Sequence, residues 1–493
     1  WPEALEAAAA GLSAAKGAGV LVGGRVSAED AYAYGKFARV VLGTNDVDFR
    51  ARPHSAAEAA FLAEHVVATG PDAGAVTYAD LSGAKAVILV GFEPEEESPI
   101  VFLRLRRAVR KARTAVYAVA PFASRGTQKL SATLVPTAPG AEAAALADPA
   151  LTTALADGGI ILVGERMATS PGALVAAVSL AASTGAKLAW IPRRAGERGA
   201  LEAGALGALL PGGRPVTDAA ARGEVAAVWE VDSLPTTPGR DTAGIVSAAA
   251  SGALGALVVG GVDPADLALP QAADALAKAF VVSLEVRASA VTAVADVVLP
   301  VAAAAEKSGS FVNWEGRIRP FEAALSTNAM SDHRVLDMLA SELGFFMETR
   351  TQEQINDQFE ALGPWTGARA VASSAAAGSG AAYGSGDGDV VLATWPVLLD
   401  RGRMQDGEPF LAGTALPSVA RVGAALALRL QVADGDAVTV SSGSGSVSVP
   451  VEVADGMVDG VVWLPTNSGG CAVRSSLGVD AGARVTVSKG GAQ

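Results

Sequence analysis

The sequence predicts an α/β protein in which doubly wound parallel sheets are followed by a small C-terminal β-barrel. Residues 10–290 hold four apolar strands that each finish in Val-Gly and lead through a polar turn into a helical stretch. Such units pair in parallel through right-handed crossovers, and their helices cover both faces of the sheet. Past residue 390 the apolar residues alternate along short strands between Gly, Asp and Ser turns, which is typical of a small barrel.

The elements of the α/β part follow from the apolar runs and from the helical spacing between them. The four strands that end in Val-Gly are Gly19–Gly23, Ala86–Gly91, Gly159–Gly164 and Ala256–Gly260. The expected crossover helices are Ala28–Leu42, Pro99–Ala112, Pro171–Ser183 and Gln271–Lys278, and further strands are expected at Ala115–Val119, Lys187–Ile191 and Phe280–Val286. The intervals between the closing glycines are too uneven for a solenoid, so we expect two lobes.

The C-terminal part divides into a closing pair of helices, a linker and the barrel. Helical apolar spacing predicts the closing helices at His333–Leu343 and Glu353–Leu362. Small polar residues over 370–389 predict a flexible linker between two lobes in 1–369 and a barrel in 390–493, and limited proteolysis should cut there first. The barrel elements are a helix, Leu416–Leu430, and the strands Ala437–Ser441, Ser446–Val453, Gly460–Leu464 and Arg484–Ser488.

Composition excludes several classes of function. The 493 residues include one cysteine, Cys471, and three histidines, so no disulfide framework, zinc thiolate site or iron–sulfur ligand set is expected within this chain. A net charge of −13 argues against binding to nucleic acid or to an anionic membrane, and favours proteins or small molecules as partners. The most apolar stretch, Ala173–Ile191, is interrupted by polar residues and is predicted to be a helix, a turn and a strand rather than a membrane span.

Two further features bear on what the chain could bind and on its origin. Glycine-rich turns that lead into helices can bind phosphate, but the turn after Gly91 carries Glu93, Glu95, Glu96 and Glu97 at the helix start. We therefore expect these carboxylates, and likewise Asp263 and Asp266, to cap helices and to repel phosphate. The chain begins with Trp and shows no basic, apolar leader, so it is expected to be the later part of a longer polypeptide.

The stretch Ala295–Pro320 is the most informative segment. A short β-branched strand, Val297–Leu299, ends at a proline, and four alanines then predict one or two helical turns that Gly309 stops. Aromatic, amide and charged residues crowd the nine positions from Phe311 to Arg319. Such a mixture is typical of a loop folded into a cavity, and the alternative is an ordinary domain-closing loop. We expect this stretch at the junction of the two lobes.

The order of these residues adds a resemblance. The succession ADVVLP, then Glu306-Lys307-x-Gly309, then Phe311-x-Asn313-x-Glu315-Gly316-Arg317 resembles a segment found throughout the molybdopterin oxidoreductase family. Near the start, WPEAL and RVVLGTNDVDFRARPHSAAE resemble two further segments of that family, and Asp263 stands where the family usually has Asn. The final helix and strands resemble its molybdopterin-dinucleotide-binding domain, which is a double-psi barrel. The resemblance covers nearly the whole chain and is least clear at 190–250 and 378–389.

The resemblance also implies what the chain has lost. Catalytic members of the family carry a cysteine or selenocysteine metal ligand just before a histidine, and here Pro53 stands at that position before His54. Proline has no side-chain donor, so we expect no catalytic residue, no metal and no cofactor in this chain. If the old pterin cavity persists, the candidate lining residues by resemblance are Arg52, Pro53, His54, Glu306, Asn313, Glu315 and Arg317.

Within this family, a chain that keeps the fold but lacks the metal ligand resembles the large G subunit of the proton-pumping NADH-quinone oxidoreductase, respiratory complex I. That resemblance implies a non-catalytic structural domain on the cytoplasmic side of the membrane, peripheral and without membrane insertion. It also implies other peripheral-arm subunits as partners and iron–sulfur clusters in N-terminal domains outside this chain. The alternatives are a molybdenum or tungsten bis-pterin oxidoreductase, such as a formate dehydrogenase with an unusual ligand, and a free-standing small-molecule binding protein.

Overall fold

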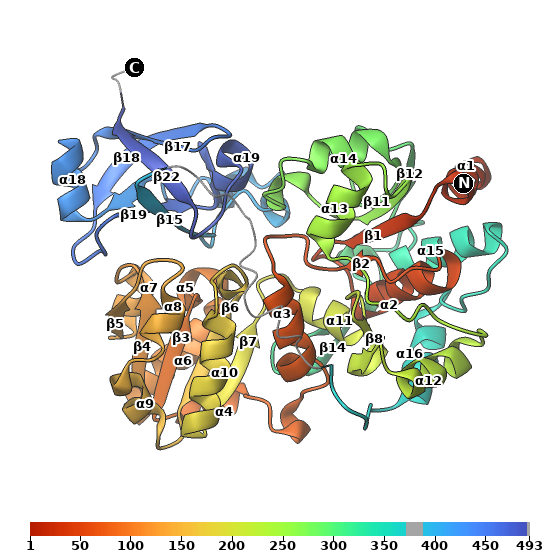
Figure 1. Ribbon diagram of the computed structural model, residues 1–493, viewed down its shortest axis with the longest axis horizontal. Coiled ribbons are helices and arrows are strands. Elements are labelled where there is room, and N and C mark those ends of the chain that lie inside the picture. Colours follow the sequence, from red (N-terminus) through yellow and green to blue (C-terminus); the bar gives the residue numbers. More distant parts are fainter. Residues whose placement is uncertain (371–387, 491–493) are drawn as a thin grey trace. The chain divides into compact units, whose positions relative to one another are not determined.

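The computed structural model describes residues 1–370 and 388–490 (Figure 1). Among these residues two compact units form, and each is described by itself. The first unit contains residues 1–52, 59–73 and 194–370, and the second contains residues 53–58, 74–193 and 388–490. Both units hold a five-stranded parallel sheet with helices packed on it, and the second unit also holds a closed barrel.

The sheet of the first unit has the strand order β12-β11-β10-β1-β2, and every neighbouring pair is parallel. Its strands are β1 (Ala18–Val22), β2 (Val47–Asp48), β10 (Ala256–Gly260), β11 (Phe280–Glu285) and β12 (Val297–Pro300). Every residue of β1 and β10 is buried, which explains why these strands are continuous apolar runs rather than alternating ones. The predicted strands at 19–23, 256–260, 280–286 and 297–299 are confirmed.

Helices cover this sheet. They include α1 (Pro2–Ala14), α2 (Ala28–Lys36), α11 (Glu197–Glu202), α13 (Thr242–Ala250), α14 (Ala272–Lys278), α15 (Asp332–Glu342) and α16 (Gln352–Leu362). Helix α2 begins at Ser27, whose hydroxyl accepts from the amide of Asp30 while the Asp30 carboxylate accepts from the amide of Ser27. It continues as a π-helical turn through Phe37–Val41, so the helix predicted over 28–42 is confirmed in extent.

The stretch 295–320 differs from its prediction. The alanines form a single 3₁₀ turn, Ala304–Glu306, and the residues after it form a β-hairpin, β13 (Gly309–Val312) and β14 (Ile318–Phe321), rather than an irregular loop. The rings of Phe311 and Phe321 stack across the two strands, with 5.0 Å between the ring centroids. The whole stretch lies within the first unit, and its expected place at a junction of lobes stays a prediction.

The second unit repeats the sheet design with the order β5-β4-β3-β6-β7, again parallel throughout. Its strands are β3 (Ala86–Val90), β4 (Ala115–Ala120), β5 (Thr133–Pro136), β6 (Ile160–Gly164) and β7 (Lys187–Ile191). Its helices include α4 (Tyr78–Gly83), α5 (Pro94–Glu97), α6 (Pro99–Ala112), α7 (Arg125–Lys129), α9 (Pro149–Leu155) and α10 (Ala173–Thr184) (Figure 1). The predicted helix at 99–112 and strand at 187–191 have the observed bounds.

The barrel closes in the order β15-β19-β16-β18-β17-β22. Its strands are β15 (Val390–Trp395), β16 (Ala420–Val422), β17 (Ala437–Ser441), β18 (Ser446–Val453), β19 (Val461–Pro465) and β22 (Arg484–Lys489). One prediction here was wrong. The helix expected over 416–430 is only α18 (Ala424–Leu430), because Gly423 caps its start and the residues before it form strand β16 between β18 and β19.

Two predictions depend on how far the structural description extends. The expected linker at 370–389, where proteolysis should cut first, lies almost wholly outside the described residues, so it stays a prediction. Across residues 1–370 and 388–490, no helix is both long enough and apolar enough to cross a membrane.

Candidate functional site

Each parallel sheet has one point where the strand order reverses, and ligands of such folds bind in the crevice beyond the carboxyl ends of the strands at that point. In the first unit the reversal lies between β1 and β10, because the chain adds β2 on one side and β11 and β12 on the other. In the second unit it lies between β3 and β6 for the same reason. These two crevices are the places to look for a functional site.

In both sheets the turns that follow the paired strands are in close backbone contact. In the first unit the amide of Gly23 donates to the carbonyl of Gly260 at 2.8 Å, and a Cβ added at Gly23 would collide with the carbonyl oxygen of Gly261. In the second unit a Cβ at Gly164 would collide with the carbonyl oxygen of Gly91. Glycine at positions 23 and 164 therefore permits the close approach of the neighbouring turns.

A buried charge network occupies the carboxyl edge of the first sheet. The guanidinium of Arg25, just after β1, donates to both carboxylate oxygens of Asp332 at 2.8 and 3.0 Å. The ammonium of Lys307 donates to Asp30 at 2.5 Å and to Asp332 at 3.1 Å, and the hydroxyl of Tyr34 donates to Asp332 at 2.9 Å. Two cations and two carboxylates thus balance each other inside the unit.

The pKa directions in this network agree with mutual stabilisation of the charged forms. Burial opposes ionisation of Asp332, but the charges of Arg25 and Lys307 outweigh burial and hold its pKa well below the usual range. Burial lowers the pKa of Lys307, and the facing carboxylates of Asp30 and Asp332 raise it above its usual value overall. Buried ion pairs of this kind fix one arrangement of the chain rather than offering a titratable catalytic group.

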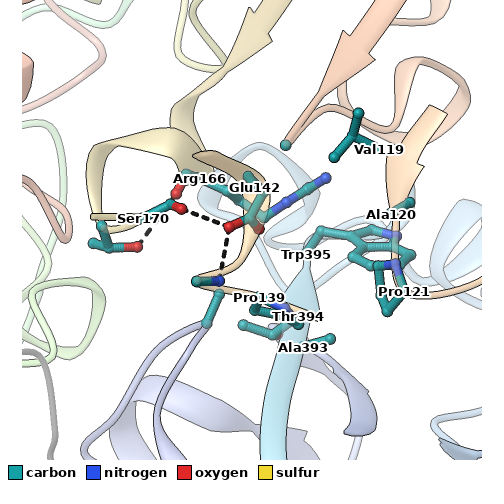
Figure 2. A pocket seen from close by; sticks show the side chains of 14 residues that line it. Val119, Ala120, Pro121, Pro139, Glu142, Arg166, Ser170, Ala393, Thr394 and Trp395 are labelled. Carbon is teal, nitrogen blue, oxygen red and sulfur yellow. Dashed lines mark hydrogen bonds between the residues drawn. The ribbon is translucent and has the colours of Figure 1, made fainter. Parts of the chain in front are cut away.

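The second unit holds a pocket at the matching edge, between the ends of β3, β4 and β6 and strand β15 of the barrel (Figure 2). Glu142 accepts from the amide of Gly140 at 2.7 Å and from the hydroxyl of Ser170 at 2.5 Å. The guanidinium of Arg166 lies 4.9 Å from the ring centre of Trp395. About 30 Å³ is open to the centres of water molecules, which is far below the roughly 300 Å³ of a small ligand pocket.

Three glutamates with buried side chains, Glu93, Glu97 and Glu142, have Arg166 as a common charged neighbour, and Glu142 lines the pocket. Arg166 donates to Glu97 at 2.6 Å, and the hydroxyl of Ser124 donates to Glu93. Burial raises the pKa of Glu93 to about 7, and burial is also the main cause that raises the pKa values of Glu97 and Glu142. Glu93 caps α5 through the amide of Glu95, so the acidic turn caps its helix as the sequence predicts.

Three of the predicted site residues come together in the hairpin turn. The side chain of Asn313 donates to Glu315 at 2.8 Å and accepts from the amides of Glu315 and Arg317. Glu315 is buried and Arg317 is exposed, with 3.4 Å between Glu315 Oε2 and Arg317 Nε. Gly316 has a φ of +82° and packs against the carbonyl of Thr69. The turn satisfies its own polar groups, so these residues have a clear structural role.

The other predicted site residues do not join that cluster. Glu306 accepts from the amide of Ala303 and so caps its 3₁₀ turn. Arg52 is buried and pairs with Glu197 at 2.8 Å. Pro53 and His54 are buried in the second unit, whereas the other candidates belong to the first. A common cavity lined by all seven candidates stays a prediction.

The chemistry for holding a metal is sparse. Across the described ranges 1–370 and 388–490, no group of three or more His, Cys, Asp or Glu side chains could hold a metal ion. Cys471 is buried in the barrel, where burial raises the pKa of its thiol to about 12, and its Sγ contacts the carbonyl of Pro465 at 3.4 Å. A thiol of that pKa is neutral at physiological pH and is a poor metal ligand.

The residues that fill the two sheet edges are not among the candidates predicted from the sequence. In the first unit these are Arg25, Asp30, Tyr34, Lys307 and Asp332, and in the second they are Glu142, Arg166, Ser170 and Trp395. A signal was present, because Arg25 and Arg166 each follow the closing glycine of a Val-Gly strand by two residues. Their partners are up to 307 residues away in sequence, and no local pattern identifies them.

Comparison with protein-family models decides the affiliation. Residues 1–340 match the model of the molybdopterin oxidoreductases, and residues 406–488 match that of the molydopterin dinucleotide binding domain. The chain belongs to the molybdopterin oxidoreductase family. The predicted family and fold class are thereby confirmed, with the closed barrel as the C-terminal component.

Curated relatives within the molybdopterin oxidoreductases point to one branch. The chain is 54% identical to the G subunit of NADH-quinone oxidoreductase from Mycobacterium bovis and 50% identical to the G subunit from Streptomyces coelicolor, over 99% of its length in both cases. It spans about three fifths of those relatives, since 61% of each is covered. Formate dehydrogenase H of Escherichia coli is 28% identical over only 34% of this chain and 24% of its own length.

Among solved structures, acetylene hydratase from Pelobacter acetylenicus shares the fold of this molybdopterin oxidoreductase family member. The TM-score is 0.55 at 12% sequence identity, over 98% of this chain and 85% of the hydratase. At that identity the likeness shows the fold alone.

Proposed function

We propose that this chain is a non-catalytic structural domain of a proton-pumping NADH-quinone oxidoreductase. In this role it supports electron transfer from NADH to quinone without carrying electrons itself. Its partners would be other subunits of the peripheral arm on the cytoplasmic side of the membrane. The iron–sulfur clusters that carry the electrons would lie outside this chain.

The observation that carries the proposal is the filling of both sheet edges by the protein's own groups. The turns after β1 and β10 touch, as do the turns after β3 and β6, and only glycine permits these contacts. Beside them, the Arg25–Asp332 and Lys307–Asp30 pairs occupy one edge, and Arg166 with its glutamates occupies the other. A molybdopterin dinucleotide has several phosphate and ring groups, and the residues present do not fit it at either edge.

The side chains available as metal ligands also support a structural role. By resemblance Pro53 stands at the metal-ligand position, and proline offers no side-chain donor. The pocket of the second unit is lined by Glu142, which accepts from Gly140 and Ser170, and by Arg166, which donates to Glu97, so both charged side chains are already engaged within the unit. The residue at the metal-ligand position therefore cannot bind molybdenum, and the charged residues of the pocket do not suit a dinucleotide. Both points support a structural role.

The test is deletion of residues 1–493 from the parent polypeptide in a bacterium that depends on its NADH-quinone oxidoreductase. Subunit composition and electron paramagnetic resonance of the remaining complex are measured together. We expect impaired assembly of the peripheral arm, with unchanged signals from any clusters that survive. A fully assembled complex that lacks one specific cluster signal would show that this region binds a redox centre, and the proposal would fail.

A further inference from the structure

Helix α6 carries an unusual concentration of positive charge for an acidic protein. Its sequence, PIVFLRLRRAVRKA, contains no carboxylate, whereas the whole chain has 51 Asp and Glu against 38 Lys and Arg. Six cations lie within the ten residues that end at its C-cap: Arg104, Arg106, Arg107, Arg110, Lys111 and Arg113. All six side chains belong to exposed residues, so the charge faces solvent.

The buried and exposed faces of α6 are sharply divided. Val101, Phe102, Leu105 and Ala108 are buried and fix the helix on its unit. On the opposite side, spacings of three and four residues place Ile100, Leu103, Arg104, Arg107 and Lys111 along one stripe. Ile100 and Leu103 are each 55% exposed. The outward stripe thus begins with two aliphatic side chains and continues with cations.

Local stability does not account for this stripe. Cations in the last turn complement the helix dipole, which explains Arg110 and Lys111. Arg104 and Arg107 lie further back, where like charges three and four residues apart repel each other. Among the described residues no ion pair involves any of the six cations, and the ring of Tyr78, 5.5 Å from the Arg104 guanidinium, is a packing contact. By contrast, buried arginines such as Arg50 and Arg52 pair with carboxylates of their own unit.

We propose that the outward stripe of α6 is a docking surface for an acidic segment of another protein subunit, with Ile100 and Leu103 as its apolar anchors. An aliphatic pair beside a row of cations suits a protein interface, which has an apolar centre and a charged rim. The helix is about 21 Å long, and a square patch of the roughly 800 Å² that each partner buries in a standard interface has an edge of about 28 Å, so the helix spans most of such a patch. A broad anionic membrane or a nucleic acid would also contact other surfaces of the chain, where the excess of carboxylates would repel it. A single acidic protein segment would contact the stripe alone.

This inference rests on the proposed function only because the partner is taken to be another subunit of the NADH-quinone oxidoreductase. The first test compares acetylation of Lys111 in the isolated chain and in the purified NADH-quinone oxidoreductase, with Lys85, whose side chain is 68% exposed, as the reference. We expect Lys111 to react at least several-fold more slowly in the complex and Lys85 to change less. A carbodiimide should join Lys111 Nζ through an amide bond to an Asp or Glu of another subunit.

The second test reverses the charge of the stripe. The triple variant Arg104→Glu, Arg107→Glu, Lys111→Glu should reduce retention of the chain in the purified complex by roughly tenfold, and raised salt should weaken retention of the wild type. The matched control, Lys16→Glu, Arg334→Glu, Arg350→Glu, changes net charge equally at exposed positions of the first unit and should be retained. Circular dichroism of both variants shows whether the fold is kept.

Other outcomes overturn the proposal. Equal acetylation of Lys111 in both states, with other lysines protected, would reject the docking surface while leaving the proposed function intact. Absence of the chain from the complex would reject both. Stripe-dependent flotation with phosphatidylglycerol vesicles, or a stripe-dependent mobility shift of single-stranded RNA, would assign the surface to a membrane or to a nucleic acid instead.

Discussion

At the scale of single residues, the charged side chains at the edge of the first sheet form ion pairs with one another. Asp332 accepts from Arg25, Lys307 and Tyr34, so its lone pairs are used within the fold. Such a network holds its elements in one arrangement because any missing member leaves a buried charge unpaired. The residues therefore stabilise the sheet edge rather than preparing a reaction.

Removal of one cation from this network should be costly. Lys307→Met leaves Asp30 without its closest cation in a buried site, and we expect a loss of about 3 to 5 kcal/mol in the free energy of unfolding. Urea denaturation followed by circular dichroism measures this loss. The control Lys16→Met removes an exposed lysine and should change stability by no more than about 0.5 kcal/mol. Equal stability of the two variants would contradict the role given to Lys307.

Glu93 predicts a pH dependence of stability. Its pKa is about 7 in the folded protein because of burial, against 4.5 when unperturbed, so between these values the folded state binds more protons than the unfolded state. Stability must then fall as pH rises from about 4.5 to about 7, by roughly 3 kcal/mol for this shift. Asp332 does not oppose this trend in that window, because its lowered pKa acts only at more acidic pH.

The substitution Glu93→Gln tests this pH dependence. It should flatten the fall in unfolding free energy between about pH 5 and pH 7, measured by urea denaturation at several pH values. Asp157→Asn, at a side chain that is 79% exposed, is the control and should leave the slope as it is. An unchanged slope in the Glu93 variant would show that this carboxylate is ionised throughout.

At the scale of elements, the two sheets close their edges in the same way. Gly164→Ala places a Cβ against the carbonyl of Gly91, and we expect a loss of about 1 to 3 kcal/mol in stability because backbone must shift. Gly83→Ala, at the end of α4 in the same unit, meets open space and should be neutral or slightly stabilising. Thermal denaturation of the two variants should separate them clearly, and similar melting temperatures would argue against tight closure.

The elements also show what the sequence can predict. Buried parallel strands such as β6 were predictable because each is an unbroken apolar run that ends in Val-Gly. Strand β16 was not, because Ala420–Val422 adjoins an alanine- and leucine-rich run with helical spacing, and only the barrel partners β18 and β19 make it a strand. The hairpin that begins at Gly309 was likewise not predictable from the sequence, because its strand pairing depends on the turn at Asn313 rather than on alternation of apolar and polar residues.

At the scale of the whole molecule, the family segments predicted fold class and affiliation, but not the state of the site. Resemblance placed Arg52, Pro53, His54 and Asn313 near an old cofactor cavity. That placement stays a prediction. What the sequence did not predict is that each described sheet edge is occupied by side chains distant in sequence, such as Arg25 with Asp332. Long-range ion pairs of this kind follow from the tertiary fold and cannot be predicted from local spacing.

We expect this molybdopterin oxidoreductase family member to hold no molybdenum or tungsten. The most direct measurement is elemental analysis, together with pterin fluorescence, of the full chain purified from cells grown with molybdate and tungstate. We expect both metals at background level and no pterin signal, because Pro53 offers no donor and the protein's own charged side chains occupy the sheet edges. Near-stoichiometric metal with a pterin signal would contradict it and would favour a molybdenum or tungsten oxidoreductase.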